Sequence, residues 1–246
     1  MLSLRAFVFL TCLIASAPAS GSDEISLGAL DDETYHDTRN GVVQLVCQDE
    51  ASGQRYLSRA AVLSLPGFEA HYDILLATRH AVMDGNVERN CHIRGERLQV
   101  GQITRIETSV LTAEEAGDFN LDWAIIRTHG RLSPRIPRLR AIAFDGEAPG
   151  QVSLLRASVE TDPCTVNRGP GPRDEPALIF HDCFSRPGLS GSPLLVELDG
   201  EAFVIGIHIG EYIMLDPPAR HYGVARRLND AFLQALIDFI ADESAG

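Results

Sequence analysis

Three side chains in separate stretches of the chain could together carry out nucleophilic catalysis. Ser190 lies in the turn-rich stretch PGLSGSPLL, His80 directly follows an apolar run in LLATRHAV, and Asp122 opens the stretch DWAII. A serine hydroxyl is a weak nucleophile at neutral pH, so it needs a base such as imidazole. The imidazole in turn needs a carboxylate that fixes its tautomer. A glycine-containing turn before the serine can aim backbone N–H groups at a developing oxyanion. The chain holds all these parts, in the order His, Asp, Ser.

Two other serines in the same turn compete for the role of nucleophile. Ser190 is favoured because Gly188 and Gly191 flank it and an apolar strand follows. Ser185 has no glycine on either side, and Ser192 is the second rival.

The base and the carboxylate also have competitors. His80 is favoured because it follows an apolar strand and precedes small and apolar residues, which is not true of His36, His71, His92 and His129. Asp122 precedes apolar residues that would bury its carboxylate, whereas Asp118 lies in the turn-like AGDFN.

Most of the chain between these residues reads as short strands separated by turns. The apolar or alternating runs are GVVQLVCQ, RYLSRAAVLSL, YDILLATRH, RLQVGQITRIET, LDWAIIRT, GQVSLLRASVE, ALIFHDCF, SPLLVELDG, AFVIGIHIGEYI and RHYGVAR. Pro134 and Pro137 suit a surface linker between two halves. The end differs, since Phe232, Leu236, Phe239 and Ile240 recur at helical spacing after Asn229, a candidate cap. This pattern predicts an all-β barrel or sandwich with a C-terminal helix.

The N-terminal residues have the pattern of a secretory signal peptide. A basic start, an apolar run of about a dozen residues and a small-residue exit predict a leader over residues 1–19, because the run is too short to span a bilayer. Residues 20–40 are acidic and weakly periodic, which predicts a loose N-terminal arm or a short pro-segment.

Cysteine usage and charge limit the ligands and partners. Four cysteines remain after the leader, Cys47, Cys91, Cys164 and Cys183, and in an oxidising compartment they favour two disulfides with three pairings open. They form no C-x-x-C pair, so we expect no metal site and no cofactor. A net charge of -13 without a basic run argues against nucleic acid and anionic membranes as partners. We expect a monomer that is secreted or periplasmic.

These segments resemble the chymotrypsin-like (trypsin-family) serine peptidases, especially the bacterial secreted branch that includes the glutamyl endopeptidases. The similarity lies in TRHAV, LDWAIIR, GLSGSP and the later VIGIHIG, and covers roughly residues 40–243. It implies an exported serine endopeptidase that hydrolyses polypeptides. The domain over 41–243 would contain two six-stranded antiparallel β-barrels, the first over about 41–130 and the second over about 141–228. A C-terminal helix over about 228–242 would follow.

The resemblance also implies a role for each site residue. Ser190 would form the acyl-enzyme, His80 would act as general base and then acid, and Asp122 would orient the imidazole. The N–H groups of Gly188 and Ser190 would form the oxyanion hole. The segment His208, Ile209 and Gly210 would line the substrate pocket, unless His208 is only a hydrogen-bonded core histidine. In the glutamyl endopeptidase branch a histidine of this segment helps to receive an acidic side chain. The pairing implied for the disulfides is Cys47–Cys91 and Cys164–Cys183, one in each barrel.

Three positions depart from the digestive members of the family. Leu189 stands where they carry the aspartate that pairs with a newly cut N-terminus, so we expect no activation by that route. Phe184 stands about where a trypsin-like enzyme keeps the aspartate of its pocket floor, so we expect no preference for lysine or arginine. Ser192 replaces a glycine. This replacement also argues against the G-x-S-x-G elbow of an α/β-hydrolase esterase, whose residue order would differ. A catalytically silent barrel that binds peptides or proteins is the remaining alternative.

Overall fold

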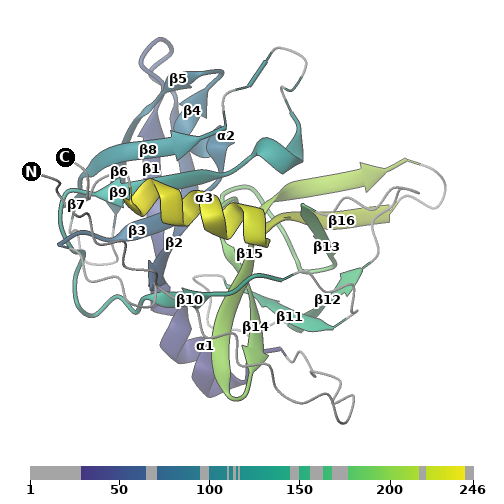
Figure 1. Cartoon of the computed structure of the whole chain (residues 1–246). Helices are drawn as coiled ribbons and strands as arrows, with labels where there is room; N and C mark the ends of the chain where they lie inside the picture. The colour runs from purple at the N-terminus through teal and green to yellow at the C-terminus, as the bar shows by residue number, and fades with distance from the viewer. Residues whose placement is uncertain are drawn as a thin grey trace, which may run out of the picture.

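The computed structural model describes residues 29–64, 71–94, 100–109, 111–112, 115, 117–144, 150–155, 163–167, 177–215 and 220–241. The predicted leader over residues 1–19 lies outside the described residues. The chain is mostly β with a C-terminal helix, which confirms the predicted fold class (Figure 1).

Seven strands of the first half form one barrel. They are β1 (Val42–Gln48), β2 (Arg55–Ser64), β3 (Ile74–Ala77), β6 (Asn90–Arg94), β7 (Val100–Gly101), β8 (Ile103–Thr108) and β9 (Ala124–Thr128). Their pairing order is β7-β6-β1-β2-β3-β9-β8, antiparallel throughout. Only Gln102 separates β7 from β8, so the two act as one bent strand that pairs β6 at one end and β9 at the other. Counted in this way, six strands close the barrel.

Six strands of the second half form a barrel closed by pairing alone. They are β11 (Gln151–Leu154), β12 (Pro163–Asn167), β13 (Leu178–His181), β14 (Pro193–Leu198), β15 (Glu201–Met214) and β16 (Arg220–Arg227). The order β14-β11-β12-β13-β16-β15 returns to β14, because β14 and β15 are also paired. Asp199 and Gly200 both have positive φ (54° and 75°), as a tight two-residue turn between β14 and β15 requires.

The segment between the barrels is more than a surface linker. After the prolines, β10 (Leu139–Ala141) pairs in parallel with β2 of the first barrel and with β15 of the second. Strand pairing therefore holds the two barrels to one another.

The helices pack against both halves. Helix α3 (Asp230–Ala241) begins after Asn229, whose side chain accepts a hydrogen bond from Phe232 N at 3.0 Å, which confirms the predicted cap. Its buried side chains, such as Phe232, join a core that also holds Leu76 of β3 and Val204 of β15. Trp123 meets the Phe232 ring edge-on at 5.4 Å between centroids. The helix thus packs over the junction between the barrels, across which it runs in Figure 1.

The described part of the expected loose arm is folded. Helix α1 (Asp32–Thr38) starts at Asp31, whose carboxylate caps Thr34 N at 2.7 Å, and the 3-10 helix η1 (Arg39–Gly41) follows. Leu30 and Tyr35 are buried in the core shared by the barrels. These two apolar anchors dock residues 30–40, the described end of the segment 20–40 for which a loose arm or a short pro-segment was expected.

Both disulfides form with the implied pairing. Cys47 on β1 and Cys91 on β6 lie directly opposite in the strand register. Cys164 on β12 joins Cys183, which follows β13. By the loop-entropy relation each cross-link stabilises the fold by about 3–4 kcal/mol. No helix within the described ranges is long and apolar enough to cross a membrane.

Candidate active site

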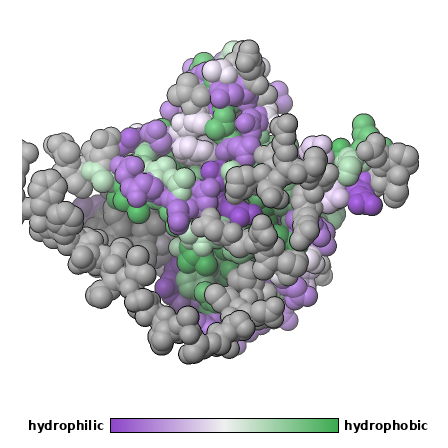
Figure 2. Space-filling view, turned by 45° about the vertical axis from the view of Figure 1, so that its right-hand side comes forward, coloured by the Kyte–Doolittle hydropathy of each residue, from purple (hydrophilic) through white to green (hydrophobic). Residues whose placement is uncertain are grey.

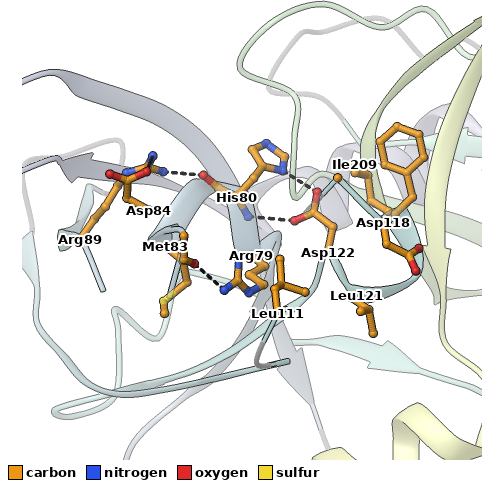
Figure 3. A pocket seen from close by; sticks show the side chains of 13 residues that line it. Arg79, His80, Met83, Asp84, Arg89, Leu111, Asp118, Leu121, Asp122 and Ile209 are labelled. Atoms are coloured by element: carbon orange, nitrogen blue, oxygen red, sulfur yellow. Dashed lines mark hydrogen bonds and ion pairs between the residues drawn. The ribbon is translucent and has the colours of Figure 1, made fainter. Parts of the chain in front are cut away.

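His80 and Asp122 meet at the edge of the first barrel. Strand β3 ends at Ala77, and the one-turn helix α2 (Arg79–Val82) then carries His80 out of the barrel. Asp122 follows the short helix η2 (Phe119–Leu121). One carboxylate oxygen accepts from His80 N at 2.8 Å, and the other lies 2.6 Å from the ring Nδ1 (Figure 3). Two contacts thus fix both the backbone and the ring of His80, which directs Nε2 away from the carboxylate.

Two buried arginines hold α2 in place. The Arg79 side chain donates to Ser109 O at 2.9 Å and to Asn86 Oδ1 at 2.7 Å. The Arg89 guanidinium lies 3.9 Å from the centre of the Tyr56 ring and donates to the carbonyl of His80. Burial lowers the pKa of Arg79, and the charge of Asp122 opposes that shift. The histidine is therefore held through its own carbonyl as well as through Asp122.

A cavity of about 420 Å³ opens beside this pair. The first barrel contributes His80, Asp122 and Phe119, and the second contributes Ile209. The cavity therefore lies where the two barrels meet, and Figure 3 shows His80 and Asp122 at its wall.

Backbone contacts across the barrels shape the turn that carries Ser190. Arg59 N of β2 donates to Ser190 O at 2.8 Å, and Gly191 N donates to His208 O at 2.7 Å. Gly191 has a φ of +85°, and an added Cβ would overlap the carbonyl of Arg59, so only glycine fits. The serine turn of the second barrel is thus hydrogen-bonded directly to β2 of the first barrel.

The Ser190 hydroxyl donates to the carbonyl of Ile209 at 3.1 Å. Within the described residues no hydrogen bond joins it to His80. Neither Gly188 N nor Ser190 N donates to an acceptor in the described part of the chain, and Gly188 has a φ of +90°. Both N–H groups belong to the same turn as the hydroxyl and have no acceptor among the described residues.

None of the competing residues Ser185, Ser192 and Asp118 hydrogen-bonds to His80 within the described part of the chain. Ser192 is fully buried, and its hydroxyl has no hydrogen-bond partner among the described residues. Asp118 caps η2 through Asn120 N at 2.8 Å instead of binding His80. The Ser185 hydroxyl lies 2.8 Å from His208 Nε2.

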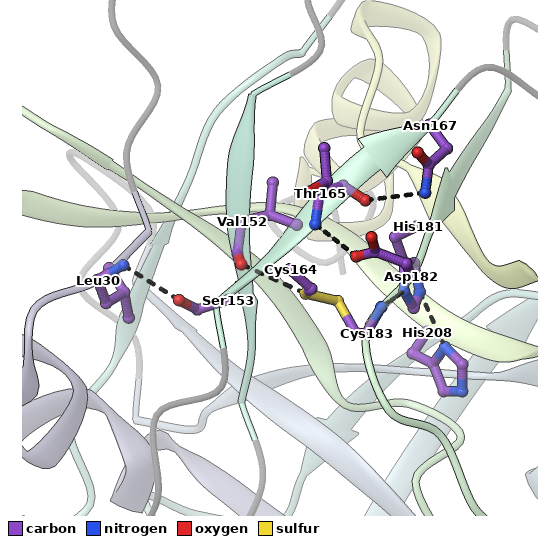
Figure 4. The surroundings of a disulfide bond; sticks show 10 residues. All are labelled: Leu30, Val152, Ser153, Cys164, Thr165, Asn167, His181, Asp182, Cys183 and His208. Carbon is purple, nitrogen blue, oxygen red and sulfur yellow. Dashed lines mark hydrogen bonds between the residues drawn. A yellow bond between two sulfur atoms is a disulfide. The ribbon is translucent and has the colours of Figure 1, made fainter.

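A chain of polar groups runs from this serine into the second barrel. His208 Nδ1 lies 3.2 Å from His181 Nε2, and His181 Nδ1 accepts from Cys183 N at 3.2 Å (Figure 4). Burial, with a smaller contribution from the charge of His80, lowers the pKa of His208 to about 4. Burial and the neighbouring His208 lower the pKa of His181 to about 3. Both rings are therefore neutral at pH 7. The series of hydrogen-bonded groups runs from the Ser185 hydroxyl through both rings to Cys183 N.

The other residues implied as substrate-binding differ in their surroundings. Ile209 lines the cavity, and the pairing of β15 with β16 shifts register around it, between His208 and Gly210. Phe184 is 58% exposed, so its ring does not form an enclosed pocket floor. The next residue, Ser185, makes the inward contact with His208.

Solved structures share this architecture at low sequence identity. A thermostable serine protease AL20 from an extremophilic microorganism matches with a TM-score of 0.58 at 16% identity, covering 80% of this chain and 95% of that one. A Glu endopeptidase matches at 0.55 and 12% identity, covering 85% and 92%. The protease Anisep from Arthrobacter nicotinovorans matches at 0.60 and 10% identity, covering 80% and 93%. The fold is that of the chymotrypsin-like serine proteases.

Sequence comparison does not identify a family for this chain. No protein-family model matches the chain. The genome polyproteins of Salivirus A (isolate Human/Nigeria/NG-J1/2007) and Human klassevirus 1 are each 28% identical over 169 residues, which is 68% of this chain. The chain spans 6% of the length of these curated relatives.

Sequence reasoning missed two residues of the site in this chymotrypsin-like fold. His181 was not considered, although it sits in the apolar run LIFH, where a lone histidine needs a buried partner. For Ser185 the sequence suggests only the role of a rival nucleophile. Its contact with His208 depends on the path of residues 182–186 after β13, which no local pattern specifies.

Proposed function

We propose that the protein is an exported serine endopeptidase that uses Ser190, His80 and Asp122. The observation that carries the proposal is the two-point contact between His80 and Asp122, beside a cavity between the barrels. The chymotrypsin-like fold and the serine turn of the second barrel support it. The two disulfides support export, because such bonds persist in oxidising compartments.

In the proposed reaction His80 Nε2 takes the proton of the Ser190 hydroxyl as its oxygen attacks the peptide carbonyl carbon. Asp122 keeps the proton of the ring on Nδ1 and stabilises the imidazolium. The N–H groups of Gly188 and Ser190 bind the oxyanion. The imidazolium then protonates the leaving amine, and water releases the acyl group from Ser190 by the same steps.

The resting contact of Ser190 with Ile209 O fits this proposal. A substrate backbone N–H that donates to Ile209 O would replace the hydroxyl there. The hydroxyl would then be released from Ile209 O and free to donate to His80. Catalytic hydrogen bonds are often loose before substrate binds and tighten in the complex.

Covalent labelling tests the nucleophile. A fluorophosphonate probe should label the purified protein, and Ser190→Ala should abolish labelling. Ser185→Ala and Ser192→Ala, in the same loop, serve as matched controls that keep it. Labelling that survives in Ser190→Ala would reject the assignment. Absence of labelling in the unaltered protein, together with inertness towards casein, would favour the binding-module alternative.

For the side chain before the scissile bond, we propose an acidic preference. The Ser185 hydroxyl, partly buried beside the His208 ring, can donate to a carboxylate, and Phe184 offers no charge to a lysine or arginine. The presence of a Glu endopeptidase among proteins of this fold agrees with the idea. Cleavage sites mapped by mass spectrometry on a diverse peptide pool should follow glutamate or aspartate. Sites that follow mainly lysine or arginine would contradict it.

The proposed activity should also not require activation by a newly cut N-terminus that pairs with the residue before Ser190. Leu189 is buried and carries no charge, so it cannot form the ion pair that switches on digestive relatives. Chain cleavage near residue 40 is therefore not expected to create an essential amine beside Ser190.

A further inference from the structure

Strand β15 extends well beyond the second barrel along one edge. Its pairing with β14 ends at Ile207, whereas its pairing with β16 continues to Met214. His208 still bonds the serine turn, since its N–H donates to Ser192 O and its C=O accepts from Gly191 N. From Ile209 onward this edge of β15 has no strand partner in the described part of the chain. Figure 1 shows the hairpin of β15 and β16 projecting from the body of the molecule.

The open edge begins at the candidate active site. Ile209 O, its first acceptor, holds the Ser190 hydroxyl. Residues of a strand present their N–H and C=O groups to one edge at every second position. Register with β16 is regular from Gly210 to Met214, so Glu211 and Ile213 direct their backbone groups to the same edge as Ile209.

Apolar side chains accompany this edge. Tyr212 is 43% exposed, Ile213 is 47% exposed, and Leu215 just beyond the strand is 83% exposed. The lobe that projects at the right of Figure 2 carries green side chains beside purple ones, in the position of this hairpin. An unpaired strand edge with exposed apolar residues invites another chain to pair with it.

We propose that this edge binds the segment of a polypeptide substrate that lies four to six residues before the scissile bond. The inference rests on the proposed function and adds a recognition site outside the catalytic centre. With the residue before the scissile bond donating to Ile209 O, an antiparallel substrate strand places its third residue opposite Glu211 and its fifth opposite Ile213. Main-chain hydrogen bonds would hold the strand, and apolar side chains at the fourth to sixth residues would contact Tyr212 and Ile213. The substrate is thus an extended, unfolded or loop segment with apolar residues upstream of the cut.

Matched peptides test the backbone part of this site. A peptide with seven residues before the cleaved bond, apolar at the fourth to sixth, is compared with one truncated to three. A third peptide carries an N-methyl group on the amide of the fifth residue. The long peptide should have a kcat/KM about tenfold higher than the other two, because hydrogen bonds and cross-strand contacts are lost in both. Equal values for the three peptides would overturn the proposal.

Variants test the side-chain part. Ile213→Ser should lower kcat/KM for the long peptide by about fivefold and leave the short peptide unchanged. The control Ile237→Ser removes a similarly exposed isoleucine (55%) from helix α3 and should change neither. Binding of the three peptides to Ser190→Ala, measured by fluorescence anisotropy, separates recognition from chemistry. If Ser190→Ala binds the long peptide more tightly but the unaltered protein hydrolyses none of the three peptides, the edge site is supported and the proposed function is rejected. Equal binding of all three would reject the edge site alone.

Discussion

Arg89 connects the fold to the histidine at the scale of a single residue. Its side chain is 8% exposed, and it donates to the carbonyls of His80 and, at 3.4 Å, Ala81. We predict that Arg89→Met leaves these carbonyls at the end of α2 without a cation and costs about 2 kcal/mol of unfolding free energy. It should also lower kcat about tenfold with little change in KM, because His80 loses a support that does not touch substrate.

The lysine variant separates positioning from packing. Arg89→Lys keeps a cation within reach of the His80 carbonyl and should recover most of kcat. Urea unfolding and steady-state kinetics on both variants provide the check. An unchanged kcat in Arg89→Met, at measurably reduced stability, would show that the contact is structural only.

Local patterns single out the three residues proposed as a triad because each lies at a boundary that the sequence marks. His80 and Asp122 adjoin apolar strands, and Ser190 lies between glycines. The direction of the Ser190 hydroxyl could not be predicted, since it depends on the register shift around Ile209. The contact between His181 and His208 could not be predicted either, because it joins β13 and β15, which are neighbours only through β16.

The serine turn shows how two elements constrain one another. Gly191 and Gly200 both have positive φ, +85° and +75°, but a Cβ at Gly200 would meet nothing, whereas one at Gly191 would overlap the backbone of β2. We predict that Gly200→Ala costs about 1 kcal/mol from backbone strain alone. Gly191→Ala should lower the free energy of unfolding by at least about 3 kcal/mol, because the serine turn must move away from the Arg59 carbonyl. The same displacement should abolish fluorophosphonate labelling. Similar losses for the two variants, measured by urea unfolding, would contradict a specific contact between the turn and β2.

The elements differ in how far their own residues specify them. Helix α3 follows from its apolar spacing and its Asn229 cap, and most strands follow from apolar runs. Helix α1 was missed because only Leu30 and Tyr35 anchor an acidic segment, so its burial depends on the distant core it joins. Strand β10 could not be predicted, because three residues give no periodicity. It exists because β2 and β15 both present an edge to it.

At the scale of the whole molecule, the buried rings of His181 and His208 make the free energy of unfolding depend on pH. Their pKa values of about 3 and about 4 lie below the usual 6.5, so the folded protein keeps them neutral while the unfolded chain protonates them. The unfolded state therefore binds more protons as pH falls below about 6.5, and stability is full above that value and declines towards the folded pKa values. From pH 7 to pH 5 each histidine should cost about 2 kcal/mol, a loss set by the unfolded state because the folded rings remain neutral. The lowered carboxyl pKa values of Asp31, Asp49 and Glu115 act only at lower pH.

Urea unfolding at pH 7 and pH 5 checks this expectation. The unaltered protein should lose roughly 4 kcal/mol between the two pH values, and His181→Gln should lose about half as much because one buried ring no longer titrates. His92→Gln, which replaces an exposed histidine on β6, is the matched control and should keep the full dependence. If His181→Gln is too unstable at pH 7, the unaltered protein alone decides. An unfolding free energy that is the same at both pH values would mean that the rings of His181 and His208 accept protons in the folded barrel, and their burial between β13 and β15 would then have to be less complete than described.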